Sequence, residues 1–369
     1  MSSAETPVLI SGPLAAAFAA TTRAFRDGLR REGGGASLAV FHHGALAVEV
    51  TGGTAGDGRA WTPETLVMCQ SATKGVLATV AHRLTSHGLL DVDAPVAAYW
   101  PEFGQHGKAD LLVRHVLTHS AGLQKMRART KSLDEIYDLE HQVTALERQA
   151  PDYAPGTRHG YHAMTWGWLV GALISRTSGL PVQDAVRRLL AEPLGVDGLH
   201  LGCPPEHRHR VVPCRFRYPP LRSSTLPRGA GALTRDPRAM DHPVPSIGGF
   251  FDARSLATVY ALLAAEGVWE SRELIRADVL RRAVSDPLPG RDGTFHVPMR
   301  WTLGYHGMRG KKSGVIEGAF GHVGFGGSAG WADPHRGLAA AFVCDRAKTL
   351  RQDRVPRLID ALGQDLEAL

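Results

Sequence analysis

Val67-Met-Cys-Gln-Ser71-Ala-Thr-Lys74-Gly75-Val76 is the stretch from which the rest of the chain can be interpreted. It places Ser71 and Lys74 three residues apart, at the predicted start of a helix. Side chains at positions i and i+3 of a helix lie on one face. A Ser hydroxyl is a poor nucleophile without a neighbouring base, and a Lys amine becomes a base once it loses its proton. The spacing therefore predicts a nucleophilic Ser71 activated by Lys74.

The proton on Lys74 sets a physical condition for this chemistry. The reference Lys pKa of about 10.4 must fall by roughly 3 units for the amine to be neutral near pH 7. Burial and nearby positive charge both lower it. At a helix N-terminus, the Ser71 N–H has no intrahelical acceptor, so it is also available to stabilise an oxyanion.

A Ser-x-x-Lys match alone is weak, because two fixed letters recur by chance about once in a chain of this length. The alternative is a Ser that caps the helix and a solvent-facing Lys one turn later. The residues that follow favour the nucleophile, because they predict a long amphipathic helix that Gly88 can terminate. Its apolar stripe is Leu77, Val80, Ala81 and Leu84.

The composition limits the classes of protein to consider. The chain has 369 residues, of which 43% are hydrophobic, enough for a large core or two packed subdomains. No apolar run reaches the roughly 18 residues that span a membrane. The N-terminus lacks the early basic residues of a secretory signal, so we expect a cytoplasmic protein. The four cysteines and 18 histidines form no metal-ligand pattern, and we expect neither a metal nor a cofactor.

The net charge of +6 comes largely from one segment. Residues 208–238 contain eight arginines and one acid, Asp236, within a Pro-rich region, 200–245, that predicts a long loop or flap. Nucleic-acid binding is disfavoured because the segment contains no recognition helix. A solvated loop surface and the attraction of an anionic substrate both remain open.

The periodicity of the chain predicts helix and strands first, a helical middle, and strands with a helix at the end. We therefore expect an α/β fold, an antiparallel sheet flanked by terminal helices with an inserted helical subdomain. The predicted sheet subdomain is 1–75 with 247–369, and the helical subdomain is 76–246 with its loop at 200–245. Expected elements are a helix at 14–32, strands within 36–50, a connecting loop at 61–70, helices within 130–150 and 166–190, a strand at 338–343 and a helix around 355–362.

Four stretches follow one another along the chain. They are Ser71-Ala-Thr-Lys74-Gly75, then Leu89-Leu-Asp-Val-Asp-Ala-Pro-Val96 with Arg114-His-Val-Leu-Thr-His-Ser-Ala-Gly-Leu123, then Pro155-Gly-Thr-Arg-His-Gly-Tyr161, and finally Gly321-His-Val-Gly-Phe-Gly-Gly-Ser328. In this order they resemble the serine β-lactamase-like and penicillin-binding-protein-like superfamily, nearest to its class C β-lactamases and family VIII carboxylesterases. They span most of the chain.

The resemblance implies a Ser nucleophile with a Lys and a Tyr as proton-transfer partners, which map onto Ser71, Lys74 and Tyr161. A Lys ammonium would stabilise the Tyr phenolate, which could take the Ser proton and return it to the leaving group. The resemblance also places His322, Gly324 and Phe325 of the late strand beside the substrate. We expect the Phe325 N–H to bind the oxyanion together with the Ser71 N–H.

Two departures from the family pattern bear on substrate choice. The family's Tyr-x-Asn is here Tyr161-His162-Ala163, and its Lys-Thr-Gly is His322-Val323-Gly324. A His is mostly neutral at pH 7, and Val323 has no hydroxyl, so the usual groups that hold a β-lactam carboxylate are missing. We therefore expect a preference for neutral, short-chain esters. His162 is not expected to replace the Asn, because adjacent residues seldom share a face.

A second serine also lies in a catalytic-looking motif. Gly326-Gly-Ser328-Ala-Gly330 fits the G-x-S-x-G pattern of α/β-hydrolases. That fold needs an Asp and a His after the Ser, and only 41 residues follow Ser328. We interpret the segment as a glycine-rich strand beside the site.

The sequence thus predicts a serine hydrolase that cleaves carboxylic esters through an acyl-enzyme on Ser71. The alternatives are an acyltransferase that passes the acyl group to a small-molecule acceptor, a weak β-lactamase or peptidase, and a non-catalytic binding protein. We expect a small-molecule ester or acyl substrate, no nucleic acid or membrane partner, and a monomer or homodimer.

Overall fold

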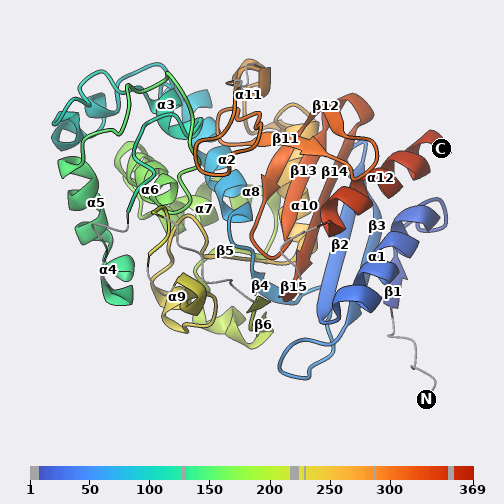
Figure 1. The fold of residues 1–369 in the computed structure, drawn as a ribbon. Helices are drawn as coiled ribbons and strands as arrows, with labels where there is room; N and C mark the ends of the chain where they lie inside the picture. The colour runs from blue at the N-terminus through green and yellow to red at the C-terminus, as the bar shows by residue number, and fades with distance from the viewer. Residues whose placement is uncertain are drawn as a thin grey trace.

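A large antiparallel sheet is built from both ends of the chain (Figure 1). The computed structural model describes residues 8–126, 130, 132–216, 224–227, 230–285, 288, 290–347 and 353–369. Within them the sheet has seven strands, in the order β1-β3-β2-β14-β13-β12-β11. The strands are β1 (Val8–Ser11), β2 (Gly35–His42), β3 (Ala45–Gly53), β11 (His306–Arg309), β12 (Val315–Val323), β13 (Ala329–Asp333) and β14 (Leu338–Cys344). Because β2 pairs with β14, the predicted fold class is confirmed.

Both faces of this sheet are covered, so its central strands are buried throughout (Figure 1). The terminal helices α1 (Ala19–Glu32) and α12 (Arg354–Glu367) cover one face, and α10 (Ala253–Ala264) covers the other. Alternate residues of a strand point to opposite faces. Accordingly, Leu38 packs in the core under α1 and α12, whereas Ala39 packs in the core under α10.

The helical part of the chain lies beside the sheet and is centred on α2 (Ala72–Ser86) (Figure 1). Nearly every residue of α2 is buried, including Lys74 and His82, because α6 (Thr165–Ser178), α10 and β12 all pack around it. The sequence predicted an amphipathic helix here, so the structure buries it further than expected. The other helices are α3 (Val113–Leu117), α4 (Leu133–Tyr137), α5 (Leu139–Arg148), α7 (Val182–Val186), α8 (Glu192–Leu194), α9 (Arg238–Asp241) and α11 (Ala277–Ser285).

One helix boundary and several short elements differ from the expectation drawn from the sequence. The helix expected from residue 14 begins at Ala19, and the loop expected at 61–70 contains β4 (Leu66–Met68). The region 200–245 is not one loop: its described residues include β6 (Val211–Val212), β7 (Arg215–Phe216) and several helical turns. Strands of two or three residues are too short to show a period of two in the sequence.

A small second sheet connects the two parts of the chain. Its order is β5-β8-β4-β6, where β5 is Leu199–Leu201 and β8 is Gly249–Phe251. Two of these strands fall within the predicted helical subdomain and two outside it. The division at residues 75/76 and 246/247 stays a prediction. The remaining strands are β9 (Val268–Trp269), β10 (Arg272–Glu273) and β15 (Arg346–Ala347), and none of the described helices could span a membrane.

Candidate active site

Ser71 lies at a tight turn between β4 and α2. Gln70 precedes it with φ of 51°, a left-handed conformation that few non-glycine residues adopt. The Ser71 hydroxyl makes no capping hydrogen bond to the helix. Lys74, one turn later, is 0% exposed. The arrangement is therefore not that of a capping Ser with a solvent-facing Lys.

Lys74 is held by Ser71 and by two backbone carbonyls. Its Nζ lies 3.1 Å from Ser71 Oγ, and it donates to the carbonyl oxygens of Ala163 at 2.9 Å and Ser246 at 3.1 Å. Burial lowers the pKa of Lys74 well below its ordinary value. A neutral amine has two N–H donors, which match the two carbonyls, and one lone pair, which is left to face Ser71 Oγ. The geometry is suited to a base.

Tyr161 contacts the same hydroxyl from the other side. Its phenol donates to Ser71 Oγ at 2.7 Å. Its ring stacks on Trp301, with centroids 5.2 Å apart, and on Phe295, at 4.7 Å. Burial raises the pKa of Tyr161 above its ordinary value, despite the bond to Ser71. The raised pKa favours the protonated phenol, which donates to Ser71 Oγ. The roles of Tyr161 and Lys74 in proton transfer stay predictions.

A buried carboxylate holds the segment around Tyr161 in place. Asp292 accepts hydrogen bonds from the Tyr161 N–H at 3.2 Å, from the Phe295 N–H at 2.8 Å and from the Trp301 indole at 2.9 Å. Burial alone would raise the pKa of Asp292, but the bonds from His159, Phe295 and Trp301 bring it below its ordinary value. Sequence reasoning missed Asp292 and Trp301, because only the fold brings them beside Tyr161.

The structure shows what His162 and Ala163 do in place of the family's Tyr-x-Asn pattern. His162 donates from Nδ1 to the Gly160 carbonyl at 2.7 Å and accepts at Nε2 from the Leu123 N–H at 3.0 Å. Both ring nitrogens are thus hydrogen-bonded to backbone groups, and neither is bonded to Ser71, as expected. Ala163 has no polar side chain, but its carbonyl oxygen orients Lys74.

The end of β12 runs along the start of α2. A Cβ on Gly324 would lie 2.2 Å from the Cys69 carbonyl oxygen, so only glycine permits this approach. His322, Gly324 and Phe325 line the same pocket as Ser71 and Tyr161. Their contact with the substrate, which the resemblance implies, stays a prediction. The identity of the oxyanion donors stays a prediction.

Ser328 lies outside this pocket's lining and is only 1% exposed. Its Oγ accepts a hydrogen bond from the Cys344 N–H at 3.2 Å. The preceding glycines form a turn, with φ of 96° at Gly326 and 101° at Gly327, and β13 begins at Ala329. The segment is therefore a glycine turn followed by a strand, rather than the continuous strand expected.

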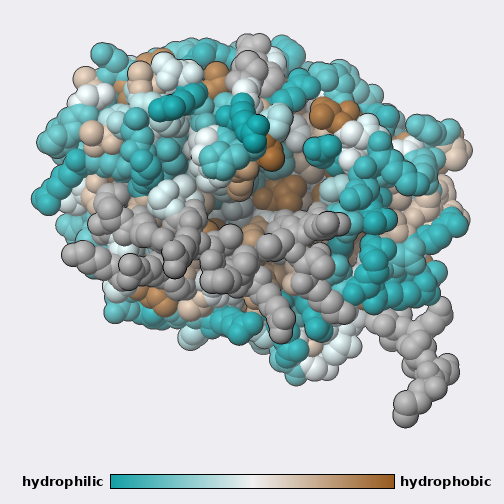
Figure 2. Space-filling view, viewed as in Figure 1, coloured by the Kyte–Doolittle hydropathy of each residue, from teal (hydrophilic) through white to brown (hydrophobic). Residues whose placement is uncertain are grey.

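The pocket above Ser71 has a volume of about 520 Å³ and is mainly apolar. Figure 2, viewed as in Figure 1, shows a hollow near the middle of the molecule, with hydrophobic atoms at its floor. Residues of the region 200–245 form part of the wall, so this region contributes to the site. The apolar wall residues are Met164, Leu226, Ala230, Leu233, Ile247, Phe295, Met299, Trp301, Val323 and Phe325.

The family model described as Beta-lactamase matches residues 18–364. The chain belongs to the beta-lactamase family. It is 39% identical over 363 residues to "Esterase/beta-lactamase LipL" of Mycobacterium tuberculosis, covering 89% of this chain and 81% of that protein.

Solved structures agree with this family. A family VIII carboxylesterase shares 31% identity with this beta-lactamase-family chain, with a TM-score of 0.87, covering 97% of this chain and 100% of that one. A penicillin-binding protein homologue from Caulobacter crescentus shares 30% identity, with a TM-score of 0.84 and the same coverage. The resemblance drawn from the four sequence stretches is confirmed.

The eight arginines of residues 208–238 fall into three groups. Arg208, Arg210 and Arg238 form ion pairs with Asp241, Asp252 and Asp236, respectively. Arg217, Arg222 and Arg228 lie outside the described residues.

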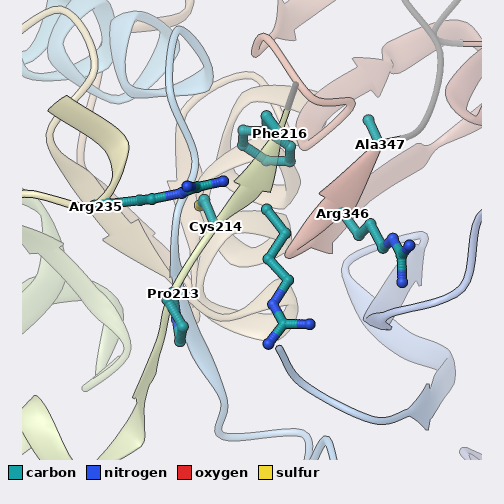
Figure 3. Close-up of a pocket in the computed structure, with 7 residues that line it drawn as sticks. Pro213, Cys214, Phe216, Arg235, Arg346 and Ala347 are labelled. Atoms are coloured by element: carbon teal, nitrogen blue, oxygen red, sulfur yellow. The ribbon is translucent and has the colours of Figure 1, made fainter. Parts of the chain in front are cut away.

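The other two, Arg215 and Arg235, line a separate hollow of about 720 Å³ together with Arg346 (Figure 3). Phe216, which also lines this hollow, packs edge-on against Phe325 of the Ser71 pocket, with centroids 6.4 Å apart. Arg235 and Arg346 lie on different sides of Phe216 in this view, rather than converging on one point. The attraction of an anionic substrate stays a prediction.

Metal ligands do not cluster within the part of the chain that the structure describes. No group of three or more His, Cys, Asp or Glu side chains there is arranged to hold a metal ion.

Proposed function

We propose that this chain hydrolyses small carboxylic esters through an acyl-enzyme on Ser71. It is a serine ester hydrolase with the β-lactamase fold. The observation that carries the assignment of Ser71 is the double contact at its Oγ, with Lys74 Nζ at 3.1 Å and the Tyr161 hydroxyl at 2.7 Å. A nucleophile bonded to both a base and an acid is the arrangement that acyl transfer requires.

In the first half-reaction, the neutral amine of Lys74 takes the Ser71 proton while Oγ bonds to the ester carbonyl carbon. The Ser71 and Phe325 N–H groups stabilise the resulting oxyanion. When the carbon–oxygen bond of the alcohol breaks, Tyr161 gives its proton to the leaving alkoxide. The Lys74 ammonium, whose Nζ lies 5.0 Å from the Tyr161 ring centroid, then stabilises the phenolate.

In the second half-reaction, the Tyr161 phenolate takes a proton from water as the water oxygen attacks the acyl-enzyme. The ester bond to Ser71 breaks, and Oγ recovers its proton from Lys74. The site is thereby returned to its starting state, and the products are the acid and the alcohol.

Slow β-lactam hydrolysis is the second candidate, since it would use the same acyl-enzyme. The printed name of the Mycobacterium tuberculosis relative, which includes both activities, supports it. Transfer of the acyl group to an acceptor other than water is an alternative that the relatives' names do not favour. A cytoplasmic location and a monomeric or homodimeric state stay predictions.

Labelling with a fluorophosphonate probe tests the identity of the nucleophile. We expect the wild type to be labelled and Ser71→Ala to be unlabelled, with p-nitrophenyl butyrate hydrolysis reduced by about 10³-fold or more. Ser328→Ala is the matched control and should keep the label and much of the activity. A labelled, active Ser71→Ala variant would show that another residue is the nucleophile.

A further inference from the structure

His322 lies on β12 with its ring in the pocket of the proposed nucleophile. Its side chain lines the pocket, and its ring centroid is 6.3 Å from those of both Tyr161 and Trp301. Nδ1 lies 3.2 Å from the Val323 carbonyl oxygen. A carbonyl oxygen can only accept, so Nδ1 carries the hydrogen and Nε2 carries a lone pair.

The Nε2 atom has no protein partner. His322 is 2% exposed, and among the described residues nothing forms a hydrogen bond with its Nε2. Burial and the nearby His306 and Lys74 lower the pKa of His322 well below its ordinary value, so the ring stays neutral. Most buried acceptors are hydrogen-bonded, and exceptions call for a specific explanation.

His306 provides a comparison within the same pocket. Its ring centroid is 5.1 Å from that of His322, and its pKa is also lowered by burial. However, its Nε2 accepts from the Val323 N–H at 3.2 Å, and its Nδ1 donates to the Gly307 carbonyl at 3.1 Å. The unpaired acceptor is therefore a property of His322 rather than of any histidine placed here.

Four hydroxyls line the pocket, those of Ser71, Tyr161, Thr225 and Thr294, and none of them is paired with Nε2. Ser71 Oγ faces the Lys74 amine, and Thr225 has a partner of its own. Tyr161 donates to Ser71 Oγ, and Thr294 donates to the Tyr161 carbonyl at 3.1 Å. The hydrogen that pairs with Nε2 is then most readily supplied by a bound molecule. That group must be a donor, because a carboxylate or carbonyl oxygen would face the lone pair of Nε2.

We propose that Nε2 of His322 accepts a hydrogen bond from a hydroxyl or amide N–H of the substrate, which makes the site selective for esters that carry such a donor. This inference rests on the proposed function, because it places the donor beside an ester bound at Ser71. It deepens that function by defining a substrate class: hydroxyl- or amide-bearing neutral esters.

Matched ester pairs test the proposal in the wild type. For the acyl side, the p-nitrophenyl ester of N-acetylglycine is compared with that of 4-oxopentanoic acid, in which CH₂ replaces N–H. For the alcohol side, 2-hydroxyethyl butyrate is compared with propyl butyrate. After division by the rates of uncatalysed hydrolysis, we expect kcat/KM to favour the donor in at least one pair by about 5- to 150-fold.

Variants of His322 then assign the preference to Nε2. His322→Phe keeps a planar ring without the acceptor and should bring the ratio of the two kcat/KM values close to one. His322→Gln can place an amide oxygen near the position of Nε2 and should keep part of the ratio. Met299→Leu alters an apolar wall residue and should keep the full ratio.

The outcomes separate this inference from the proposed function. If hydrolysis depends on Ser71 but neither pair shows a preference for the donor, the inference about His322 is wrong while the proposed function stands. A donor preference that survives in His322→Phe also overturns the inference and leaves the proposed function intact. Binding of 2-hydroxyethyl butyrate and propyl butyrate to Ser71→Ala, measured by ligand-detected NMR, gives a readout without turnover. Equal binding of the two esters there, together with no kinetic preference, also counts against the inference.

Discussion

Lys74 is a fully buried amine. Its lowered pKa bears both on its proposed action as a base and on the free energy of unfolding. Folding moves the amine from water to a site where its neutral form is favoured. The unfolded chain therefore binds one more proton than the folded chain at every pH between the lowered folded pKa and the unfolded value near 10.4. This difference in proton binding lowers the free energy of unfolding. The loss is absent above that pH window and grows as pH falls through it.

We therefore expect Lys74→Met to change how stability depends on pH. Within the window, the free energy of unfolding of the wild type should rise with pH by about 1.4 kcal/mol per pH unit more than that of the variant. Urea unfolding of both proteins at several pH values measures the difference. Parallel curves would mean that Lys74 is protonated in the folded state and cannot start the reaction as a neutral base.

His322 also leads to a prediction about β-lactams. The neutral ring and Val323 offer no charge-assisted bond to a carboxylate, and such a bond contributes roughly 1.5–3 kcal/mol, or about 10- to 150-fold. The wild type should hydrolyse p-nitrophenyl butyrate with a far higher kcat/KM than nitrocefin. His322→Lys should shift this ratio toward nitrocefin. Efficient nitrocefin turnover by the wild type would contradict the preference, and an unchanged ratio in His322→Lys would remove its explanation.

At the scale of elements, the site depends on how a turn, a strand end and a helix start meet. The turn around Asp292 holds the backbone of Tyr161, and Gly324 lets β12 approach the start of α2. Asp292 does not line the pocket, so we regard it as a positioning residue for Tyr161. Its carboxylate accepts hydrogen bonds from backbone N–H groups, from His159 and from the Trp301 indole, whose ring stacks on Tyr161.

Asp292→Asn should therefore lower kcat by about 10- to 100-fold with a smaller change in KM, because Tyr161 is displaced from Ser71 Oγ. In a Tyr161→Phe background the same change should cost little more, since the hydroxyl to be positioned is gone. Glu317→Gln, which alters an exposed ion pair with Arg300, is the control. Fully multiplicative losses in the double variant would show that Asp292 acts independently of Tyr161.

At the scale of the whole molecule, one core joins the sheet and the helical part. Phe41 and Ala339 of the sheet belong to the same buried cluster as Trp166 and Leu169 of α6, with α2 between them. The small sheet pairs β4 and β8 with β5 and β6 across the predicted subdomain boundary. Neither part could unfold without exposing apolar surface of the other.

We therefore expect a single unfolding transition, although chains of this length often unfold in steps. Scanning calorimetry should give a calorimetric enthalpy close to the van't Hoff enthalpy, with probes in α6 and in β14 losing signal together. Two resolved transitions, with residues 76–246 losing hydrogen-exchange protection first, would instead support independent subdomains.

The sequence by itself determined the main elements and the proposed catalytic residues. Long periodic segments showed α2, α6, α12 and the central strands, because burial of one face over many residues leaves a repeat that can be recognised. Ser71 and Lys74 were identifiable because a helix places residues three apart on one face, whatever the rest of the fold does. Tyr161, His322, Gly324 and Phe325 required the family resemblance, which the comparisons confirm.

Only the tertiary structure decided the protonation states and the supporting contacts. The lowered pKa of Lys74 follows from burial by α6, α10 and β12, and the raised pKa of Tyr161 follows from burial among aromatic rings. The carbonyls of Ala163 and Ser246, the carboxylate of Asp292 and the unpaired Nε2 of His322 come from segments far apart in the chain. Local sequence encodes local geometry, whereas desolvation and hydrogen-bond partners depend on which distant segments meet, and those are properties of the assembled fold.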